Sequence, residues 1–174
     1  EFYTCAYTQK IVKFGKMMQD RGYNIYIYSG ERNDTPCTEH ISVITDSMQE
    51  KWFEPWDAQK LPIPPIKEGM DENELIILVN QLMTKAILER TEKDDLVLVV
   101  GGTGHSLLGD FLPDHTIVEW AVGYPNVYFD FRAFESRAWQ HYVYGSSNLI
   151  KGSFYDRVIP NYFDLDDFPK LDNI

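Results

Sequence analysis

A glycine-rich segment, Gly101-Gly102-Thr103-Gly104-His105, follows an apolar run and has the residue types of a ligand-binding loop. Gly102 and Gly104 would let the backbone approach a ligand, with peptide N–H groups facing its oxygen atoms. His105 could hydrogen-bond a hydroxyl group or take its proton, and a structural histidine that binds a loop carbonyl is the alternative. The segment is not a dinucleotide fingerprint, because Leu107 stands at the third glycine position, and no Walker A sequence follows.

A second group of chemically useful residues lies in Glu119-Trp120-Ala121-Val122-Gly123-Tyr124. Sugars offer hydroxyl groups to a carboxylate and an apolar C–H face to an aromatic ring, so Glu119 and Tyr124 are candidates for a carbohydrate site. A buried Glu119 with satisfied hydrogen bonds is the structural alternative. Arg132, near the start of an expected helix, could help to hold a phosphate or carboxylate, and an ion pair between Arg132 and Glu135 is the alternative.

A metal site is not expected from the cysteines and histidines. Cys5, Cys37 and His40 supply only part of a zinc set, because structural zinc sites usually have two closely spaced ligand pairs and the second pair is absent. Two cysteines are also too few for a disulfide framework, although pairing of Cys5 with Cys37 stays open. The default is a reducing compartment, and we expect a cytoplasmic protein.

The hydrophobic pattern predicts the elements that must position these residues. Ile11, Phe14 and Met18 recur at helical spacing between Thr8 and Arg21. The run 96–100 is apolar at every position, as a parallel strand covered on both faces requires, so we expect it in the middle of a sheet. The other expected elements are strands at 24–29, 40–45, 117–120 and 157–159, and helices that begin near Asp46, Asp71 and Phe134.

The alternation of strands and helices predicts an α/β fold with a doubly wound, mostly parallel sheet. Ligands bind beyond the carboxyl ends of the strands in such sheets, where both candidate groups lie. The 174 residues, 44% hydrophobic, suffice for one core, and the net charge of -11 opposes binding to nucleic acid or anionic lipid. No apolar stretch is long enough for a membrane span. The chain starts without Met or a signal-peptide pattern, and we expect a fragment.

The segment 158–169, Val-Ile-Pro-Asn-Tyr-Phe-Asp-Leu-Asp-Asp-Phe-Pro, resembles the hinge motif of GT-B glycosyltransferases of the family 4 type. In that family Ile-Pro-Asn, Gly-Val-Asp and a Phe-Pro ending lead from the acceptor-binding half into the nucleotide-sugar-binding half. Tyr162-Phe163 replaces the usual Gly-Val here. Further stretches are similar to a divergent branch of the family: 5–10, 28–31, 37–40, 118–120 with Gly123-Tyr124, and 134–136 with Trp139.

The resemblance implies that residues 1–160 form a Rossmann-like acceptor-binding domain whose first strand precedes the chain. Residues 161–174 would be the hinge segment toward an absent donor-binding domain. The implied activity is transfer of a sugar from a nucleotide sugar to an acceptor hydroxyl, with retention of anomeric configuration. No cofactor or metal is expected beyond the nucleotide sugar as co-substrate, because GT-B enzymes generally stabilise the leaving group with basic side chains and helix dipoles.

The resemblance also implies roles for individual residues. His105 and Glu119 are the expected catalytic residues. The expected acceptor-binding residues are Tyr7, Thr8, Gly102, Gly104, Tyr124, Arg132 and Glu135. Because the donor half is absent, the isolated chain should be inactive. One alternative is a noncatalytic sugar- or acceptor-binding subunit that needs a separate donor-binding chain, and another is a small, unrelated nucleotide-binding protein.

Overall fold

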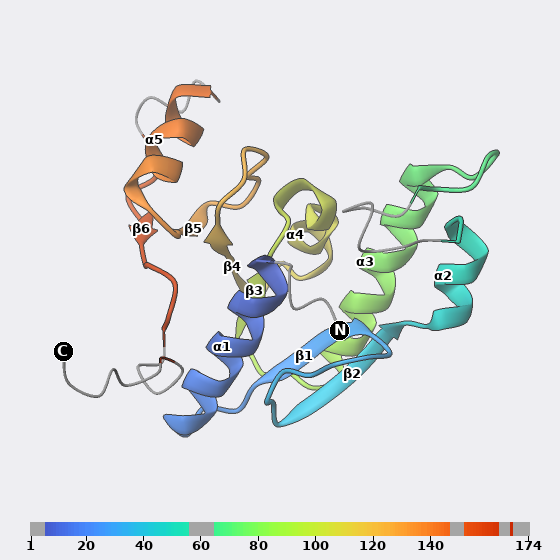
Figure 1. The fold of residues 1–174 in the computed structure, drawn as a ribbon, viewed down its shortest axis with the longest axis horizontal. Helices are drawn as coiled ribbons and strands as arrows, with labels where there is room; N and C mark the ends of the chain where they lie inside the picture. The colour runs from blue at the N-terminus through green and yellow to red at the C-terminus, as the bar shows by residue number, and fades with distance from the viewer. Residues whose placement is uncertain (1–5, 56–64, 147–151, 164–167, 169–174) are drawn as a thin grey trace.

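The computed structural model describes residues 6–55, 65–146, 152–163 and 168, which contain both helices and strands (Figure 1). The helices are α1 (Ala6–Asp20), α2 (Asp46–Trp52), α3 (Glu72–Leu88), α4 (Leu107–Phe111) and α5 (Arg137–Ser146), with a single 3-10 turn at Gly102–His105. The strands are β1 (Tyr26–Gly30), β2 (Glu39–Ile44), β3 (Leu96–Val99), β4 (Thr116–Val122), β5 (Phe131–Phe134) and β6 (Arg157–Val158). No helix in these ranges is both long and apolar enough to cross a lipid bilayer.

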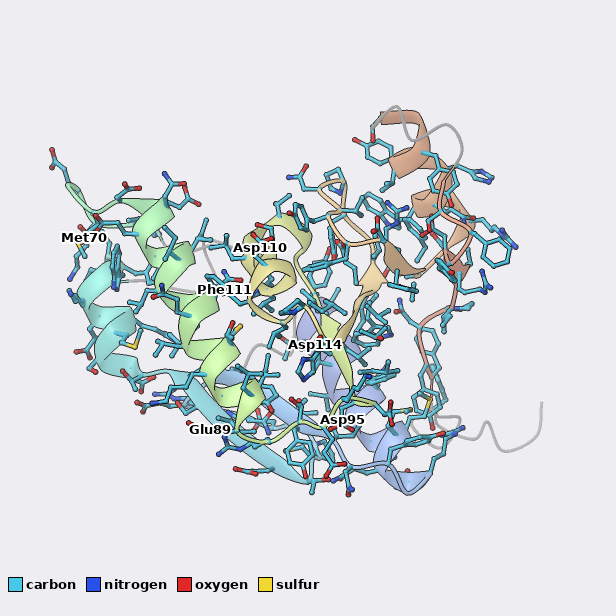
Figure 2. The ribbon with its side chains drawn as sticks, turned by 180° about the vertical axis from the view of Figure 1, so that it is seen from behind. Met70, Glu89, Asp95, Asp110, Phe111 and Asp114 are labelled. Carbon is cyan, nitrogen blue, oxygen red and sulfur yellow. The ribbon has the colours of Figure 1, made fainter. Side chains whose placement is uncertain are left out.

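The strands form two parallel sheets. β1 pairs with β2, and the second sheet has the order β3-β4-β5-β6. This confirms the predicted α/β class with mostly parallel strands. Figure 2 shows Glu89, at the C-terminal end of α3, and Asp95, just before β3, at one end of the molecule, with Asp110 of α4 farther from that end. Because β3, β4, β5 and β6 pair in parallel, the amino ends of these strands lie at one edge of the sheet and their carboxyl ends at the other.

The expectation that residues 96–100 lie in the middle of a sheet is wrong for the described chain. β3 is the first strand of its sheet, and only Val97 and Val99 are buried. Leu96 is 63% exposed and Leu98 is 40% exposed. Side chains alternate between the two faces of a strand, so one face of β3 is covered and the other is open.

Helix α3 packs against both sheets. Ile87 lies in a buried cluster with Val97 and Val99 of β3, and Ala86 lies in a second cluster with residues of β2. Met83 contacts both clusters. The two sheets therefore share one helical layer, and burial of this apolar surface is what holds them together.

Helix α1 also contacts both parts of the fold. The ring of Phe14 lies 4.4 Å from the ring of Trp120 on β4. Gly15 is buried against Thr35 and Pro36 in the loop between β1 and β2, where an added Cβ would overlap both residues. A residue without a side chain is therefore required at this helix position.

A strand occupies the segment where a helix was expected to begin. The expected helix 134–144 starts only at Arg137, and the preceding residues Phe131–Phe134 form β5, which pairs with β4 and β6. The chain changes from strand to helix at Ser136, whose hydroxyl accepts a hydrogen bond from the Trp139 N–H at 3.2 Å. Arg132 is therefore a strand residue, and its expected position near a helix N-terminus is wrong.

The side chain of Arg132 forms a buried ion pair with Asp156. Its Nε and Nη2 donate to the two carboxylate oxygens of Asp156 at 2.8 and 3.1 Å. Asp156 also accepts hydrogen bonds from the Tyr144 hydroxyl at 2.6 Å and the Ser153 N–H at 3.0 Å. Burial and this contact with Asp156 raise the pKa of Tyr144. The network joins β5, α5 and the loop before β6, and it replaces the ion pair considered between Arg132 and Glu135.

We expect Asp156→Asn to lower the free energy of unfolding by about 3–5 kcal/mol, because it leaves the buried Arg132 charge without its partner. Urea unfolding followed by circular dichroism measures this loss. The matched control is Glu39→Gln, which removes the exposed ion pair with Arg90 and should leave stability nearly unchanged. Equal effects of the two substitutions would contradict the structural role of the buried pair.

Candidate functional site

A cavity of about 300 Å³ opens at the carboxyl ends of β3 and β4. The segment that comes after β3 in the chain forms one wall, and the segment after β4 forms the other. The first turn of α1 completes the lining. The lining residues are Tyr7, Val100, Gly101, Thr103, Tyr124, Pro125 and Asn126. The cavity therefore lies at the edge where a parallel α/β sheet binds its ligands.

The glycine-rich loop bends sharply at this edge. Gly101 and Gly102 have φ angles of 109° and 51°, in the left-handed region that disfavours other residues. A Cβ on Gly102 would overlap the carbonyl oxygen of Asn126 and lie 2.7 Å from the Glu119 carboxylate. The loop is held across the cavity by hydrogen bonds from the Thr103 N–H to the Asn126 carbonyl oxygen and from the Gly101 N–H to the Tyr124 hydroxyl.

Glu119 is fully buried beneath this loop. Its Oε2 accepts hydrogen bonds from the N–H groups of Tyr128 and Phe129 at 2.8 and 3.0 Å. The carboxylate thereby fixes the segment that follows β4, including the Pro125 and Asn126 wall of the cavity. These contacts do not support a role at reacting atoms, because Glu119 does not line the cavity, and they favour a positioning role.

The end of β4 is distorted in a way that places Tyr124. The pairing of β4 with β5 shifts register between Glu119 and Val122, and Ala121 has a positive φ of 53°. Such a bulge turns the following residues away from the regular strand direction at some cost in backbone strain. Burial, with a further contribution from Glu119, raises the pKa of Tyr124 well above its ordinary value. Tyr124 is therefore a neutral hydrogen-bonding group at physiological pH.

His105 lies behind the glycine-rich loop and outside the cavity lining. Its Nδ1 is buried and has no hydrogen-bond partner among the described residues. Burial lowers the pKa of the imidazole, so the neutral form is favoured. His105 is the last residue of the glycine-rich loop and is not among the residues that line the cavity.

Four contacts tie α1 and Asn161 to the same edge. The Tyr7 hydroxyl donates to the Gly123 carbonyl oxygen at 3.1 Å, and its ring lies 6.2 Å from that of Tyr124. Lys10 forms an ion pair with Glu135, just after β5. Asn161 of the hinge-like segment donates to the same carboxylate at 3.3 Å. Glu135 thus links Lys10 of α1 to Asn161.

Most of the expected site residues meet at this edge. Tyr7, Gly102, Gly104, His105, Glu119, Tyr124 and Glu135 gather around the ends of β3, β4 and β5. Arg132 does not join them, because Asp156 holds it inside the protein. Thr8 follows Tyr7 in α1 but is not part of the cavity lining.

Two asparagines important to the loop carried no motif in the sequence. Asn80 is fully buried on α3 and donates to the Gly104 carbonyl oxygen at 2.9 Å. The one sign of Asn80 in the sequence is that it is a polar residue within the apolar face of a helix. Asn126 has no sequence signal beyond its position two residues after Tyr124, yet it lines the cavity and holds Thr103.

Within the residues described, no group of three His, Cys, Asp or Glu side chains is arranged to hold a metal ion. Cys5 lies outside the described residues. Comparison with known proteins gives no match among family models, curated proteins or solved structures.

Gly102 fits closely beneath Asn126, so we expect a larger residue at this position to destabilise the protein. Gly102→Ala should lower the free energy of unfolding by about 2–4 kcal/mol, because it combines backbone strain with overpacking. Gly104→Ala is the matched control, since an added Cβ there meets no atom within 4 Å, and it should change stability by less than about 0.5 kcal/mol. Chemical denaturation measures both, and a Gly102→Ala variant as stable as the control would contradict the described loop.

The buried imidazole of His105 predicts a pH dependence. Its pKa is lowered in the folded protein from an ordinary value of 6.5, so below about pH 6.5 the unfolded chain binds the proton first. Stability should therefore fall as the pH falls from 7.5 to 5.5. His105→Asn should reduce this fall, whereas His141→Asn, on the exposed side of α5, should not. Urea unfolding at the two pH values distinguishes these outcomes.

Proposed function

We propose that this chain is the acceptor-binding half of a GT-B glycosyltransferase of the family 4 type. The observation that carries the proposal is the cavity at the carboxyl edge, where two tyrosine rings stand beside a glycine-rich loop. A sugar can place its C–H face against an aromatic ring and its hydroxyl groups against the side chains of Thr103 and Asn126. The link from Asn161 to Glu135 supports the proposal, because it connects the hinge-like segment to this edge.

The reaction proposed for the whole protein is the transfer of a sugar from a nucleotide sugar. The acceptor hydroxyl oxygen forms a bond to the anomeric carbon, the bond from that carbon to the nucleoside diphosphate breaks, and the hydroxyl proton is released. This half of the protein orients the acceptor, and the donor-binding half would hold the nucleotide. Tyr124 cannot accept the proton at neutral pH, because its raised pKa keeps it protonated.

The noncatalytic alternative has one observation in its favour. Among the described residues that line the cavity there is no carboxylate and no imidazole. A cavity with this lining can bind a sugar without taking part in proton transfer. In that case the chain would act as a sugar- or acceptor-binding subunit that docks with a separate donor-binding chain.

A transfer assay tests the proposed function. The protein encoded by the complete gene is incubated with radiolabelled UDP-, GDP- and ADP-sugars and a panel of monosaccharide, disaccharide and alkyl glycoside acceptors. We expect transfer from one donor, and Tyr7→Ala should raise the acceptor KM roughly tenfold without changing the donor KM, because one stacking surface is lost. Tyr7→Phe keeps the ring and should retain most of the acceptor affinity.

The control is Tyr23→Ala, which removes an exposed tyrosine far from the cavity lining. Its kinetic constants should match those of the unchanged protein. Sugar binding without transfer from any donor would favour the noncatalytic subunit. Neither binding nor transfer with the whole panel would contradict both proposals.

A further inference from the structure

We propose that Tyr124 determines which ligands the cavity accepts. Its hydroxyl occupies backbone donors of the glycine-rich loop that would otherwise bind a phosphate, so the cavity accepts uncharged sugars and rejects phosphorylated ones. The inference rests on the proposed function where it names the ligand a sugar. The exclusion of phosphate rests only on the loop, the carboxylates behind it and the lining of the cavity.

The glycine-rich loop has the backbone of an anion-binding turn. Gly101 and Gly102 have positive φ angles of 109° and 51°, and the 3-10 turn Gly102–His105 continues directly from them. Successive N–H groups in a turn of this kind point to one side and form a concave set of donors, which binds phosphates and other anions. Such a loop would be expected to hold the phosphate of a nucleotide or of a sugar phosphate.

In the folded protein these donors already have acceptors. The Gly101 N–H donates to the Tyr124 hydroxyl oxygen at 3.1 Å, and Gly102 contributes a second backbone hydrogen bond to the same hydroxyl. The Thr103 and Gly104 N–H groups donate to carbonyl oxygens of the protein at 3.3 and 3.2 Å. An incoming phosphate would lose its hydration and find no free donor among these four groups.

Tyr124 is the one side-chain acceptor in this set. Tyr124 and Gly101 both line the cavity, so the hydroxyl and the N–H that it accepts meet at the cavity wall. The acceptors of the Thr103 and Gly104 N–H groups are backbone carbonyls, which no substitution removes. The Tyr124 hydroxyl oxygen therefore stands where an oxygen atom of a bound phosphate would stand.

Two carboxylates lie directly behind the wall to which Tyr124 belongs. An added Cβ on Gly102 would lie 2.7 Å from Oε1 of Glu119, and one on Gly123 would lie 2.5 Å from Oε1 of Glu135. After burial, Glu119 is the next cause of the raised pKa of Tyr124, so its electrostatic effect reaches the hydroxyl. Carboxylates this close to the loop oppose the approach of an anion.

The cavity supplies no positive charge to offset them. None of the described residues that line it is a lysine, an arginine or a histidine. Lys10 lies 4.5 Å from the centre of the Tyr7 ring, but its ammonium group is paired with Glu135. A phosphate in the cavity would therefore lack the cationic partner that phosphate sites in proteins commonly use. The same argument places the diphosphate of a nucleotide sugar outside this cavity.

Titration of the ¹⁵N-labelled protein with inorganic phosphate, followed by NMR, tests the exclusion. In the unchanged protein we expect no saturable shift of the Gly101 and Thr103 amides up to about 50 mM phosphate. Tyr124→Phe keeps the ring and frees the donors that the hydroxyl occupies. Phosphate should then shift these amides saturably with a Kd of about 5 mM or lower, a gain of at least roughly tenfold.

Tyr7→Phe is the matched control, because it removes a hydroxyl of the same cavity that donates to the Gly123 carbonyl oxygen. It should respond to phosphate like the unchanged protein. Saturable phosphate shifts of the loop amides in the unchanged protein would overturn the proposal. A Tyr124→Phe variant that responds no more strongly than Tyr7→Phe would overturn it as well.

A second measurement needs no substitution. Glucose, galactose and mannose are titrated into the unchanged protein beside their 1-phosphates and 6-phosphates. For any hexose that binds, we expect both phosphates to bind at least roughly tenfold more weakly. Equal affinities would overturn the exclusion and leave sugar binding by the cavity intact. Phosphate binding by Tyr124→Phe without binding of any sugar would support the role of Tyr124 and contradict the proposed function.

Discussion

The buried carboxylate of Glu119 organises the carboxyl edge of the larger sheet. It accepts two backbone hydrogen bonds from the segment after β4 and lies against Gly102 in the loop after β3. A buried polar group without hydrogen-bond partners costs free energy, so the two hydrogen bonds to Oε2 hold the segment after β4 against the side chain of Glu119. Gly102, with its left-handed backbone, lies against this carboxyl group, the bulge in β4 directly follows it, and burial together with a smaller contribution from Glu119 raises the pKa of Tyr124.

Helices hold the resulting cavity from two sides. From α3, the buried amide of Asn80 holds the Gly104 carbonyl, and from α1 the Tyr7 hydroxyl holds the Gly123 carbonyl. The cavity is therefore defined by positions far apart in the sequence, and the residues that line it carry no charged side chain. This uncharged, mostly apolar lining with two tyrosine rings suits a neutral ligand that has an apolar face. It supports the proposed orientation of an acceptor sugar, in which the charged nucleotide would be bound elsewhere in the whole protein.

The sequence predicted a helix or strand correctly where the local residue pattern fits only one of the two. The helix that begins after Asp71 is present, with Asp71 as its N-cap, and the strand predicted at 40–45 overlaps β2. The strand β5 was missed because Phe131–Phe134 is short and continues into aromatic residues that also fit a helix. The partner of Arg132 was missed because Asp156 is 24 residues away, a separation that no local pattern encodes. Glu119 and Tyr124 were placed at the correct edge, but burial of the carboxylate depends on the loop that folds over it.

The central claim is that the cavity at the carboxyl edge binds a sugar acceptor. Its most direct test is a titration of the ¹⁵N-labelled protein with the same panel of mono- and disaccharides, followed by NMR. The account predicts saturable shifts in the amides of Gly101, Thr103 and Asn126, with smaller changes in the adjoining turn of α1. Shifts confined to the exposed aromatic residues Phe154 and Tyr155, or no saturable shift with any sugar, would contradict it.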